Sequence, residues 1–459
     1  FFGNTLNLEA ESGRIFDNPI EQATSSMTLV PLSPVNVQGS IGGDLAGPYR
    51  VLSETPLRKL LGSLVQAVDI SGEGKVHLDI DIPIKPEHEL RLASRVDFDN
   101  ARVHAKQADI TLEETRGSVM ISEEGISGEG LIAQVSGVPM QLAIARRGND
   151  TLVNASLTLS EKLIMQFAGA KMPLAGSADL DLELTLPAPG SAQSGAMRLT
   201  ATSNLQGMAV HLPLSLAKTA GSKRAIRVRW QPGGDKVDIN YDDVLRLRTA
   251  GDGSALIGDF TAEDLQGSLR YPLDGGSLVM NLEKLAISPD FGASGERKGL
   301  RTQPFDIPPL DVSVKHFLIN ASDFGQLRLR TRHTAGAHEV SEFAIRGEIM
   351  TFTATGNWTS RGSSLRGNLA SQRLGATLRK LDITDQVTEA RGNIEMKLDW
   401  PGPLLEFSLK KANGDIRVST SEGRFTSANP GFGRILGLVN VAALKRRLTL
   451  DFSDLTEEG

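Results

Sequence analysis

The sequence contains no cysteine among its 459 residues, and aromatic residues make up only 5% of it. The lack of cysteine excludes disulfides and thiolate metal sites. No run of about 18 apolar residues occurs, so no segment of this sequence is predicted to span a membrane as a helix. A net charge of −6 also lacks the basic excess typical of nucleic-acid binding. The remaining apolar content, 40% of residues, is ordinary for a folded protein and is mainly aliphatic.

Strict alternation of apolar and polar residues is the clearest positive signal. Residues 177–187 read SADLDLELTLP, in which leucines alternate with Asp179, Asp181, Glu183 and Thr185. Successive side chains of a strand point to opposite faces, so this segment predicts a strand with one aliphatic and one acidic face. Exposing a leucine to water costs about 1.5–3 kcal/mol, so something apolar must cover the aliphatic face.

The same pattern occurs three times, each time after a candidate amphipathic helix. The strands are GKVHLDIDIP from Gly74, GSADLDLELTLP from Gly176 and GNIEMKLDWP from Gly392. The helix candidates are residues 56–68, 161–169 and 371–381, and a fourth covers 430–445. The residues predicted to share the apolar face are Val76, Leu78, Ile80, Ile82, Leu180, Leu182, Leu184, Leu186, Ile394, Met396, Leu398 and Trp400.

Many further short strands, separated by turn signals about ten residues apart, predict an antiparallel meander. We divide it into a β segment over residues 1–55, a repeat-containing segment over 56–187, a third segment over 188–303 and a C-terminal region over 304–459. These four parts are expected to form one continuous rod. Four short helices are too few to cover so many strands. The sheet therefore either folds on itself as a sandwich or barrel, or stays open as a gutter covered by something other than protein.

Several segments resemble the AsmA-like family of bacterial envelope proteins, and within it the YhdP-like members. They are residues 307–311 (IPPLD), 324–327 (FGQL), 356–358 (GNW), 392–400 and above all 431–454, GFGRILGLVNVAALKRRLTLDFSD. The resemblance implies a mainly β fold, in which a long twisted antiparallel sheet curls into an open, taco-like apolar groove with a few short amphipathic helices. On this interpretation the alternating residues above line the groove. The membrane helix before this segment and the region after Gly459 are expected in the parent protein.

The resemblance also implies a function. The parent protein would be anchored in the inner membrane, project into the periplasm and carry phospholipid between the inner and outer membranes, with acyl chains on the leucine-lined face and head groups in water. The expected partners are phospholipid acyl chains and the two membranes, reached through the terminal segments, and not nucleic acid. A second interpretation is a periplasmic structural or tethering β-rod that supports outer-membrane integrity without transport. A third is an all-β enzyme acting on envelope glycans.

Catalytic and metal-binding patterns are weak throughout. The seven histidines form no HxxxH or HExxH motif. His333 and His338 flank a turn and could face each other on adjacent strands, but with no carboxylate-rich partners around them they are predicted to be solvated. Residues 431–437 resemble a dinucleotide loop but have the wrong spacing and no βαβ context. Acidic pairs such as Asp79 with Asp81 lie on the polar strand face, where a solvated surface explains them. We therefore predict no enzyme activity, no metal and no cofactor.

Overall fold

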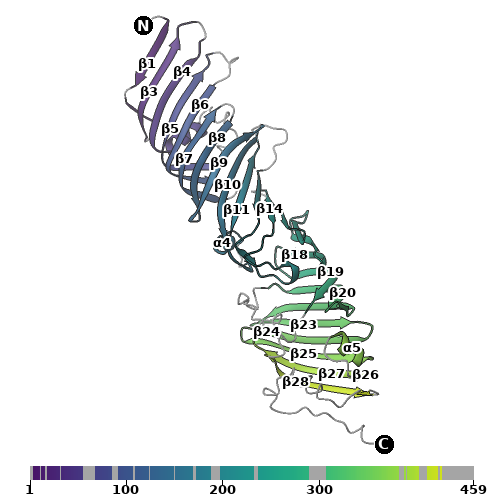
Figure 1. Cartoon of the computed structure of the whole chain (residues 1–459). Coiled ribbons are helices and arrows are strands. Elements are labelled where there is room, and N and C mark those ends of the chain that lie inside the picture. Colours follow the sequence, from purple (N-terminus) through teal and green to yellow (C-terminus); the bar gives the residue numbers. More distant parts are fainter. Residues whose placement is uncertain are drawn as a thin grey trace, which may run out of the picture. The chain divides into compact units, whose positions relative to one another are not determined.

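The computed structural model describes residues 4–10, 12–15, 18–30, 33–54, 68–84, 91–106, 109–122, 125–148, 150–168, 172–187, 197–231, 236–288, 307–381, 387–388, 390–402, 411–421 and 424–425. Within these residues the fold is mainly β (Figure 1). A sheet of 27 strands accounts for nearly all of it, and β26 (Val387–Thr388) and β29 (Arg424–Phe425) form a separate pair. The predicted fold class, a long and mainly antiparallel sheet with few short helices, is confirmed.

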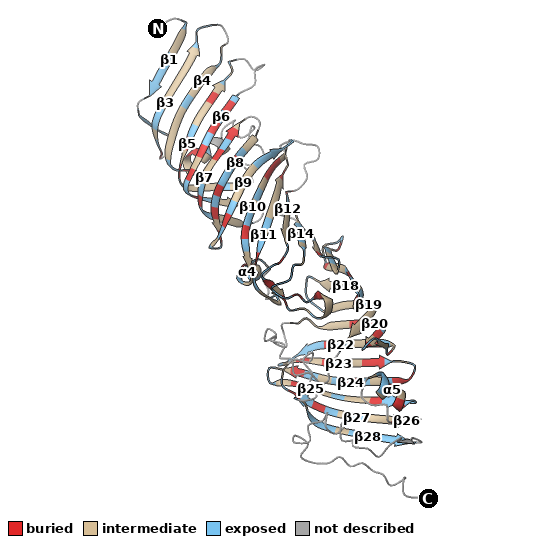
Figure 2. Cartoon of the chain, viewed as in Figure 1, coloured by how far each residue is buried: buried red, intermediate tan, exposed pale blue. Residues whose placement is uncertain are grey.

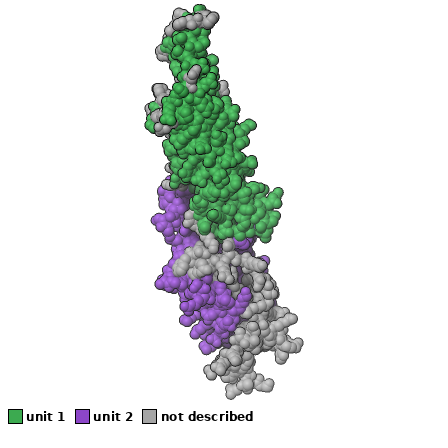
Figure 3. All heavy atoms as spheres, turned by 90° about the vertical axis from the view of Figure 1, so that its left-hand side faces the viewer, with its two compact units in different colours: residues 1–209, 219–240 green, residues 210–218, 241–459 purple. Residues whose placement is uncertain are grey.

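The chain forms two compact units (Figure 3). Unit 1 comprises residues 1–209 and 219–240, and unit 2 comprises residues 210–218 and 241–459. The fourfold division predicted from the sequence stays a prediction.

The strands of unit 1 are β1 (Thr5–Ala10), β2 (Gly13–Ile15), β3 (Asn18–Thr28), β4 (Val35–Asp44), β5 (Val68–Ile82), β6 (Arg91–Ala105), β7 (Ile110–Ser122), β8 (Gly125–Val135), β9 (Val138–Arg147), β10 (Asp150–Ser160), β11 (Leu174–Leu186), β12 (Arg198–Ser203), β13 (Met208–Val210), β14 (Ile226–Trp230) and β15 (Val237–Tyr241). From β3 to β12 the strands follow one another as antiparallel neighbours, whereas β1 and β2 both pair with β3, and β12 pairs with β14. The helices of unit 1 are α1 (Ala46–Glu54) and α4 (Glu161–Ala168).

Unit 2 continues the meander with shorter strands. They are β16 (Leu245–Thr249), β17 (Ala255–Thr261), β18 (Leu265–Pro272), β19 (Leu278–Ile287), β20 (Leu310–Ile319), β21 (Ser322–Asp323), β22 (Gln326–Thr334), β23 (Ala337–Arg346), β24 (Met350–Thr359), β25 (Gly362–Ser371), β27 (Arg391–Trp400) and β28 (Asn413–Ser421). Unit 2 also contains the 3-10 turn η1 (Leu214–Leu216) and the helix α5 (Leu374–Lys380).

One strand pair departs from the predicted antiparallel pattern. Strands β19 and β20 run parallel, with Leu278 opposite Leu310 and Ile287 opposite Ile319. A parallel pair requires a crossover that returns the chain to the same edge of the sheet, so no tight hairpin can connect these two strands. Alternation alone could not reveal this, because a strand reads the same in either direction.

Local turn chemistry fixes the register of the hairpins. Strands β8 and β9 are connected by Ser136 and Gly137 alone, and both residues have positive φ angles, 53° and 76°. A two-residue turn with both φ angles positive matches the right-handed twist of the flanking strands. The register that follows keeps Val135 opposite Val138, so the alternation of apolar residues continues from one strand to the next on one face.

The helices agree only partly with the sequence-based predictions. The predicted helices over residues 161–169 and 371–381 are present as α4 and α5. Residues 55–67, which hold most of the predicted helix over 56–68, and residues 430–445 lie outside the described residues, as does the 431–454 motif. Helix α1 was not predicted, because its sequence, AGPYRVLSE, contains a glycine and a proline in the first turn, which are weak helix signals.

The glycines of two of the three predicted repeats, Gly74 and Gly392, receive the same contact, although at Gly74 it comes from the start of α1 and not from the helix predicted over 56–68. Leu45, just before α1, donates its backbone N–H to Gly72 O at 2.8 Å, and Leu374, which begins α5, donates to Ala390 O at 2.7 Å. Each leucine side chain then lies over the glycine two residues further on, Gly74 or Gly392. A Cβ atom at Gly392 would lie 2.4 Å from Leu374 Cδ2, so only glycine leaves room for the helix. Gly176 differs, since its nearest neighbour is the Gly207 carbonyl.

Candidate apolar groove

The apolar residues of unit 1 form rows that run from strand to strand, perpendicular to the strand direction. One row crosses β8, β9, β10, β11, β12 and β14, and each member lies directly opposite the next in the register: Leu131, Leu142, Ala155, Leu182, Ala201 and Val228. Of these six side chains, only that of Leu131 is buried. The row is therefore an aliphatic surface that extends over six strands, most of it partly open to solvent.

Unit 2 has four such rows over β22, β23, β24, β25 and β27, which we name by position. The α5 row, nearest helix α5, is Leu327, Ile345, Phe352, Leu369 and Ile394. The central row is Leu329, Phe343, Ala354, Gly367 and Met396. The third row is Thr331, Val340, Gly356, Leu365 and Leu398. The rim row, at the opposite end of the strands, is His333, His338, Trp358, Ser363 and Trp400.

Burial differs between these rows (Figure 2). Three members of the α5 row are buried in the cluster that includes Leu374 of α5. In the rim row all but His333 are buried. The central row between these margins is half-buried apart from Ala354. Unit 2 therefore presents a half-open apolar strip between two covered margins.

Within the described part of the chain no extended second sheet packs on the apolar face of either unit; in unit 2, Val387 of the two-residue strand β26 joins the cluster that contains Leu374 of α5. Among the described residues, each strand makes its substantial contacts with its hydrogen-bonded neighbours, with η1 or with the short helices α1, α4 and α5. A sandwich would instead bring the apolar side chains of two stacked sheets into contact about 10 Å apart. Strands β1 and β28 each have one pairing partner among the described strands, β3 and β27, so the sheet is not closed into a barrel.

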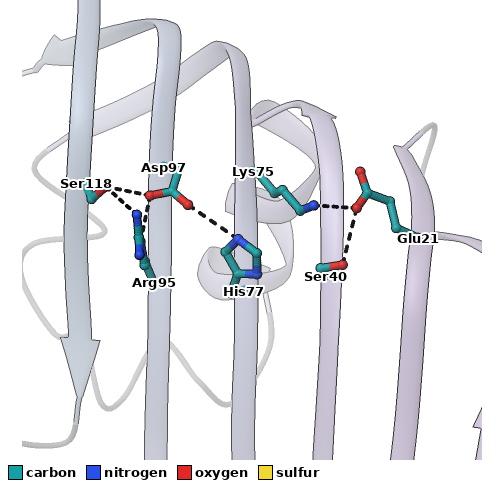
Figure 4. Close-up of polar contacts among 7 residues, drawn as sticks. All are labelled: Glu21, Ser40, Lys75, His77, Arg95, Asp97 and Ser118. Atoms are coloured by element: carbon teal, nitrogen blue, oxygen red, sulfur yellow. Dashed lines mark hydrogen bonds and ion pairs between the residues drawn. The ribbon is translucent and has the colours of Figure 1, made fainter.

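The opposite face of the sheet is polar and paired. In unit 1 seven side chains form two groups across neighbouring strands (Figure 4): Glu21, Ser40, Lys75, His77, Arg95, Asp97 and Ser118. Lys75 contacts Glu21 at 2.5 Å, and Asp97 accepts from Arg95 at 2.7 Å and contacts His77 at 3.3 Å. Cross-strand pairs of opposite charge stabilise a sheet modestly and mark the face that meets water.

The same contacts shift two carboxyl groups toward the charged form. Burial works against the ionised form of Asp97, but hydrogen bonds from Ser118 and Arg95 outweigh it and hold the pKa of Asp97 below its usual value. The hydrogen bond from Lys75 likewise lowers the pKa of Glu21. Both groups are ionised at neutral pH, so this face stays charged.

A hollow of about 890 Å³ lies on the polar face of unit 2 and not in the apolar strip. Ser268, Asn281, Ser313 and Arg328, which are neighbours in the register, line its floor. Arg328 pairs with Asp311 at 2.5 Å, so this cation is neutralised locally. A hollow of polar and paired side chains suits water better than an acyl chain.

The first predicted set of groove residues lies on β5. Val76 and Ile80 are buried in one cluster with Leu45, and Leu78 packs against that cluster. Ile82, at the end of the strand, is 44% exposed. This set therefore belongs partly to a packed core under α1.

The second set lies on β11 in unit 1 and is more open. Leu180, Leu182 and Leu184 are half-buried, and Leu186 is buried beside Met197. Leu180 and Leu182 pack against the cluster that contains Leu163 of α4.

The third set lies on β27 in unit 2, with Ile394 and Met396 half-buried and Leu398 and Trp400 buried. The register brings its four residues into the α5, central, third and rim rows in that order. All three sets stand on the apolar face of their own strand, and whether they bind a ligand stays a prediction.

The prediction that His333 and His338 are both solvated is wrong for His338. The two residues lie directly opposite each other in the register, with ring centroids 4.8 Å apart and an edge-to-face arrangement. His338 is 2% exposed, contacts Thr331 Oγ1 through Nε2 at 2.7 Å and lies 6.1 Å from the Trp358 ring. Sequence reasoning considered the two histidines as a possible facing pair but did not extend their strand face to Trp358 and Trp400, so it missed the rim.

Among the described residues, no group of three or more His, Asp or Glu side chains is arranged to hold a metal ion. None of the described helices is both long and apolar enough to cross a membrane.

In the described residues, an open sheet with an apolar face and no extended second layer places this protein in the class of β-groove proteins, as distinct from sandwiches and closed barrels. The chain belongs to the YhdP family, whose profile matches residues 1–256 and 258–459. It is also 21% identical over 526 aligned positions to the intermembrane phospholipid transporter YhdP of Escherichia coli (strain K12). That alignment covers 91% of this chain and 41% of the relative, so the chain spans less than half of the relative's length. No solved structure matches the chain significantly.

Proposed function

We propose that this chain is a segment of a phospholipid conduit, in which acyl chains lie on the apolar face of the sheet and head groups stay in water. The observation that carries the proposal is the half-buried aliphatic face, on which no extended second sheet packs within the described residues. The name of the Escherichia coli relative, an intermembrane phospholipid transporter, supports a phospholipid as the occupant.

The energetics favour such an occupant. Removing a methylene from water gains about 0.8 kcal/mol, so a chain of about 16 carbons gains roughly 12 kcal/mol on an apolar surface. A lipid therefore crosses an aqueous space far more readily on a lining of this kind than alone. Rows such as Leu142, Ala155 and Leu182 offer similar aliphatic contacts from strand to strand, which suits sliding.

This function requires binding and no bond making, so we propose a role that is not enzymatic and needs neither metal nor cofactor. We further propose that the segment works in the periplasm, in a parent protein anchored in the inner membrane. The alternative is a structural rod of the same fold that carries no lipid.

Photo-crosslinking tests the proposal on both faces of one strand. A photoreactive amino acid replaces Leu182 or Met396 on the apolar face, and Glu183 or Lys397 on the polar face as matched controls. We expect phospholipid adducts, identified by mass spectrometry, at the first pair and few or none at the second. Equal labelling of both faces, or a folded protein that never yields lipid, would support the structural rod.

A further inference from the structure

The rows of unit 2 differ in chemistry from one end of the strands to the other. The α5 row is wholly aliphatic or phenyl, whereas the rim row has only rings with a polar edge and one hydroxyl. Two of the three tryptophans in the sequence, Trp358 and Trp400, stand in this rim row. A face lined only to seal a core would have no reason to separate its side chains in this way.

The rim row is also hydrogen-bonded, and the α5 row is not. His333 Nε2 lies 2.9 Å from the Ile307 carbonyl, and His338 Nε2 lies 2.7 Å from Thr331 Oγ1. Ser363 donates to the Gly402 carbonyl at 2.8 Å. His333, the outermost of these residues, is exposed. The rim is therefore an ordered, amphipathic margin that reaches water.

Such margins occur where hydrocarbon meets water. Tryptophan is enriched at membrane interfaces because its ring is apolar and its N–H is polar. The width of the strip also suits an acyl chain. Six residues of strand separate the rim row from the α5 row, which is about 20 Å at ~3.3 Å per residue. One leaflet of hydrocarbon is about 15 Å deep, half of a ~30 Å bilayer core.

We propose that the glycerol and phosphate end of a phospholipid lies at the rim-row end of the strip in unit 2, beside the exposed His333, with the acyl chains directed over the third and central rows toward α5. The proposal rests on the proposed function and adds the orientation of the lipid. Gly356 lowers the surface beside the rim, and beyond it the Phe352 ring lies over Gly367 and packs edge-to-face with Phe343, with ring centroids 5.7 Å apart. The acyl chains thus lie in a shallow, ring-bounded strip.

Tryptophan fluorescence tests this orientation, and its first comparison leaves the rim row unaltered. In a Trp230→Phe variant of the full chain, Trp358 and Trp400 are the remaining fluorophores. The protein is loaded either with phosphatidylcholine brominated beside the glycerol ester or with phosphatidylcholine brominated near the terminal methyl. Bromine quenches at short range, so we expect several-fold stronger quenching by the first lipid. Trp358→Phe and Trp400→Phe variants in the same background assign the signal to each ring.

Each result is decisive when read with a crosslinking probe at Met396 in the central row. Stronger quenching by the methyl-end bromine overturns the orientation. Crosslinking at Met396 without quenching by either lipid also overturns it, but leaves the lipid conduit intact. The absence of both crosslinking and quenching overturns the conduit itself.

Discussion

The two units line their apolar faces with different side chains. The row over β8 to β14 of unit 1 is wholly aliphatic, with Leu142, Ala155, Leu182 and Ala201 alternating in size. The central row of unit 2 instead contains Phe343, which stands opposite Ala354. Large residues stand opposite small ones in part of each row, as Leu182 does opposite Ala155 and Phe343 opposite Ala354, but Leu131 stands opposite Leu142 and Leu329 opposite Phe343. The comparison teaches that both units keep an apolar face while the side chains that line it change.

The units agree more closely at their helices. In each, a buried leucine at the start of a short helix packs over a strand glycine, Leu45 over Gly74 and Leu374 over Gly392. The surroundings differ, because a Cβ atom at Gly74 would also lie 2.5 Å from the Asp97 carbonyl, whereas at Gly392 the next neighbour, the Ser419 carbonyl, is 3.3 Å away. A side chain at the strand glycine is therefore excluded by both backbone and leucine in unit 1, and mainly by the leucine side chain in unit 2.

The largest effect is expected from removing either leucine. Leu45 and Leu374 are 2% and 1% exposed, and replacing a buried leucine by alanine costs about 2–5 kcal/mol of unfolding free energy. Urea unfolding followed by Trp230 reports on unit 1 and by Trp358 and Trp400 on unit 2. Leu45→Ala should lower the urea midpoint of the transition reported by Trp230. Leu374→Ala should lower the midpoint reported by Trp358 and Trp400. A loss near 0.5 kcal/mol, typical of surface positions, would show that the leucine does not hold its helix.

Alanine substitutions at Gly74 and Gly392 should differ in how far they depend on the leucine that covers the glycine. Gly392→Ala should cost about 1–3 kcal/mol through overpacking against Leu374. In the Leu374→Ala background most of that cost should disappear. Gly74→Ala should remain costly even beside Leu45→Ala, because the Asp97 carbonyl still blocks the new methyl group. Double-mutant cycles measure both couplings, and equal rescue in the two units would remove the distinction.

A large side chain introduced into the aliphatic row of unit 1 tests whether this row is the path of the lipid. Ala155 is half-buried between Leu142 and Leu182, so Ala155→Phe should project into the strip with little effect on folding. We expect lipid crosslinking at Leu182 to fall about tenfold, which corresponds to ~1.4 kcal/mol of binding free energy. Ser156→Phe, the neighbouring residue on the polar face, is the matched control. Similar losses in both variants would indicate a general defect.

The smallest change in stability is expected from a substitution on the polar face, at Asp97. The pKa of Asp97 is lowered in the folded chain, so its ionised form stabilises the fold at pH values above the usual aspartate pKa of about 3.9. This contribution is lost as the pH falls through the lowered pKa of the folded state. Asp97→Asn should therefore lower stability at pH 7 by less than about 1 kcal/mol, the range of exposed ion pairs. The difference from the parent chain should shrink at acidic pH in urea titrations, and a difference independent of pH would exclude this origin.

Much of the architecture followed from the sequence. The two-residue period over residues 177–187 and its repeats was sufficient to predict the strands and their apolar faces, because side-chain direction in a strand depends only on position. The helices α4 and α5 were likewise marked by apolar stripes. The pairing of Leu45 with Gly74 could not be predicted, since the two residues are 29 positions apart and neither is unusual in its own segment.

By itself the sequence determined which residues share a face, because periodicity is a local property of the chain. Only the tertiary structure decided that no extended second sheet packs on that face within the described residues, that β19 and β20 run parallel, and that His333, His338, Trp358 and Trp400 gather at one margin. These features depend on register between strands that are distant in sequence. Register is set by turns, crossovers and packing acting together, and no single segment encodes it.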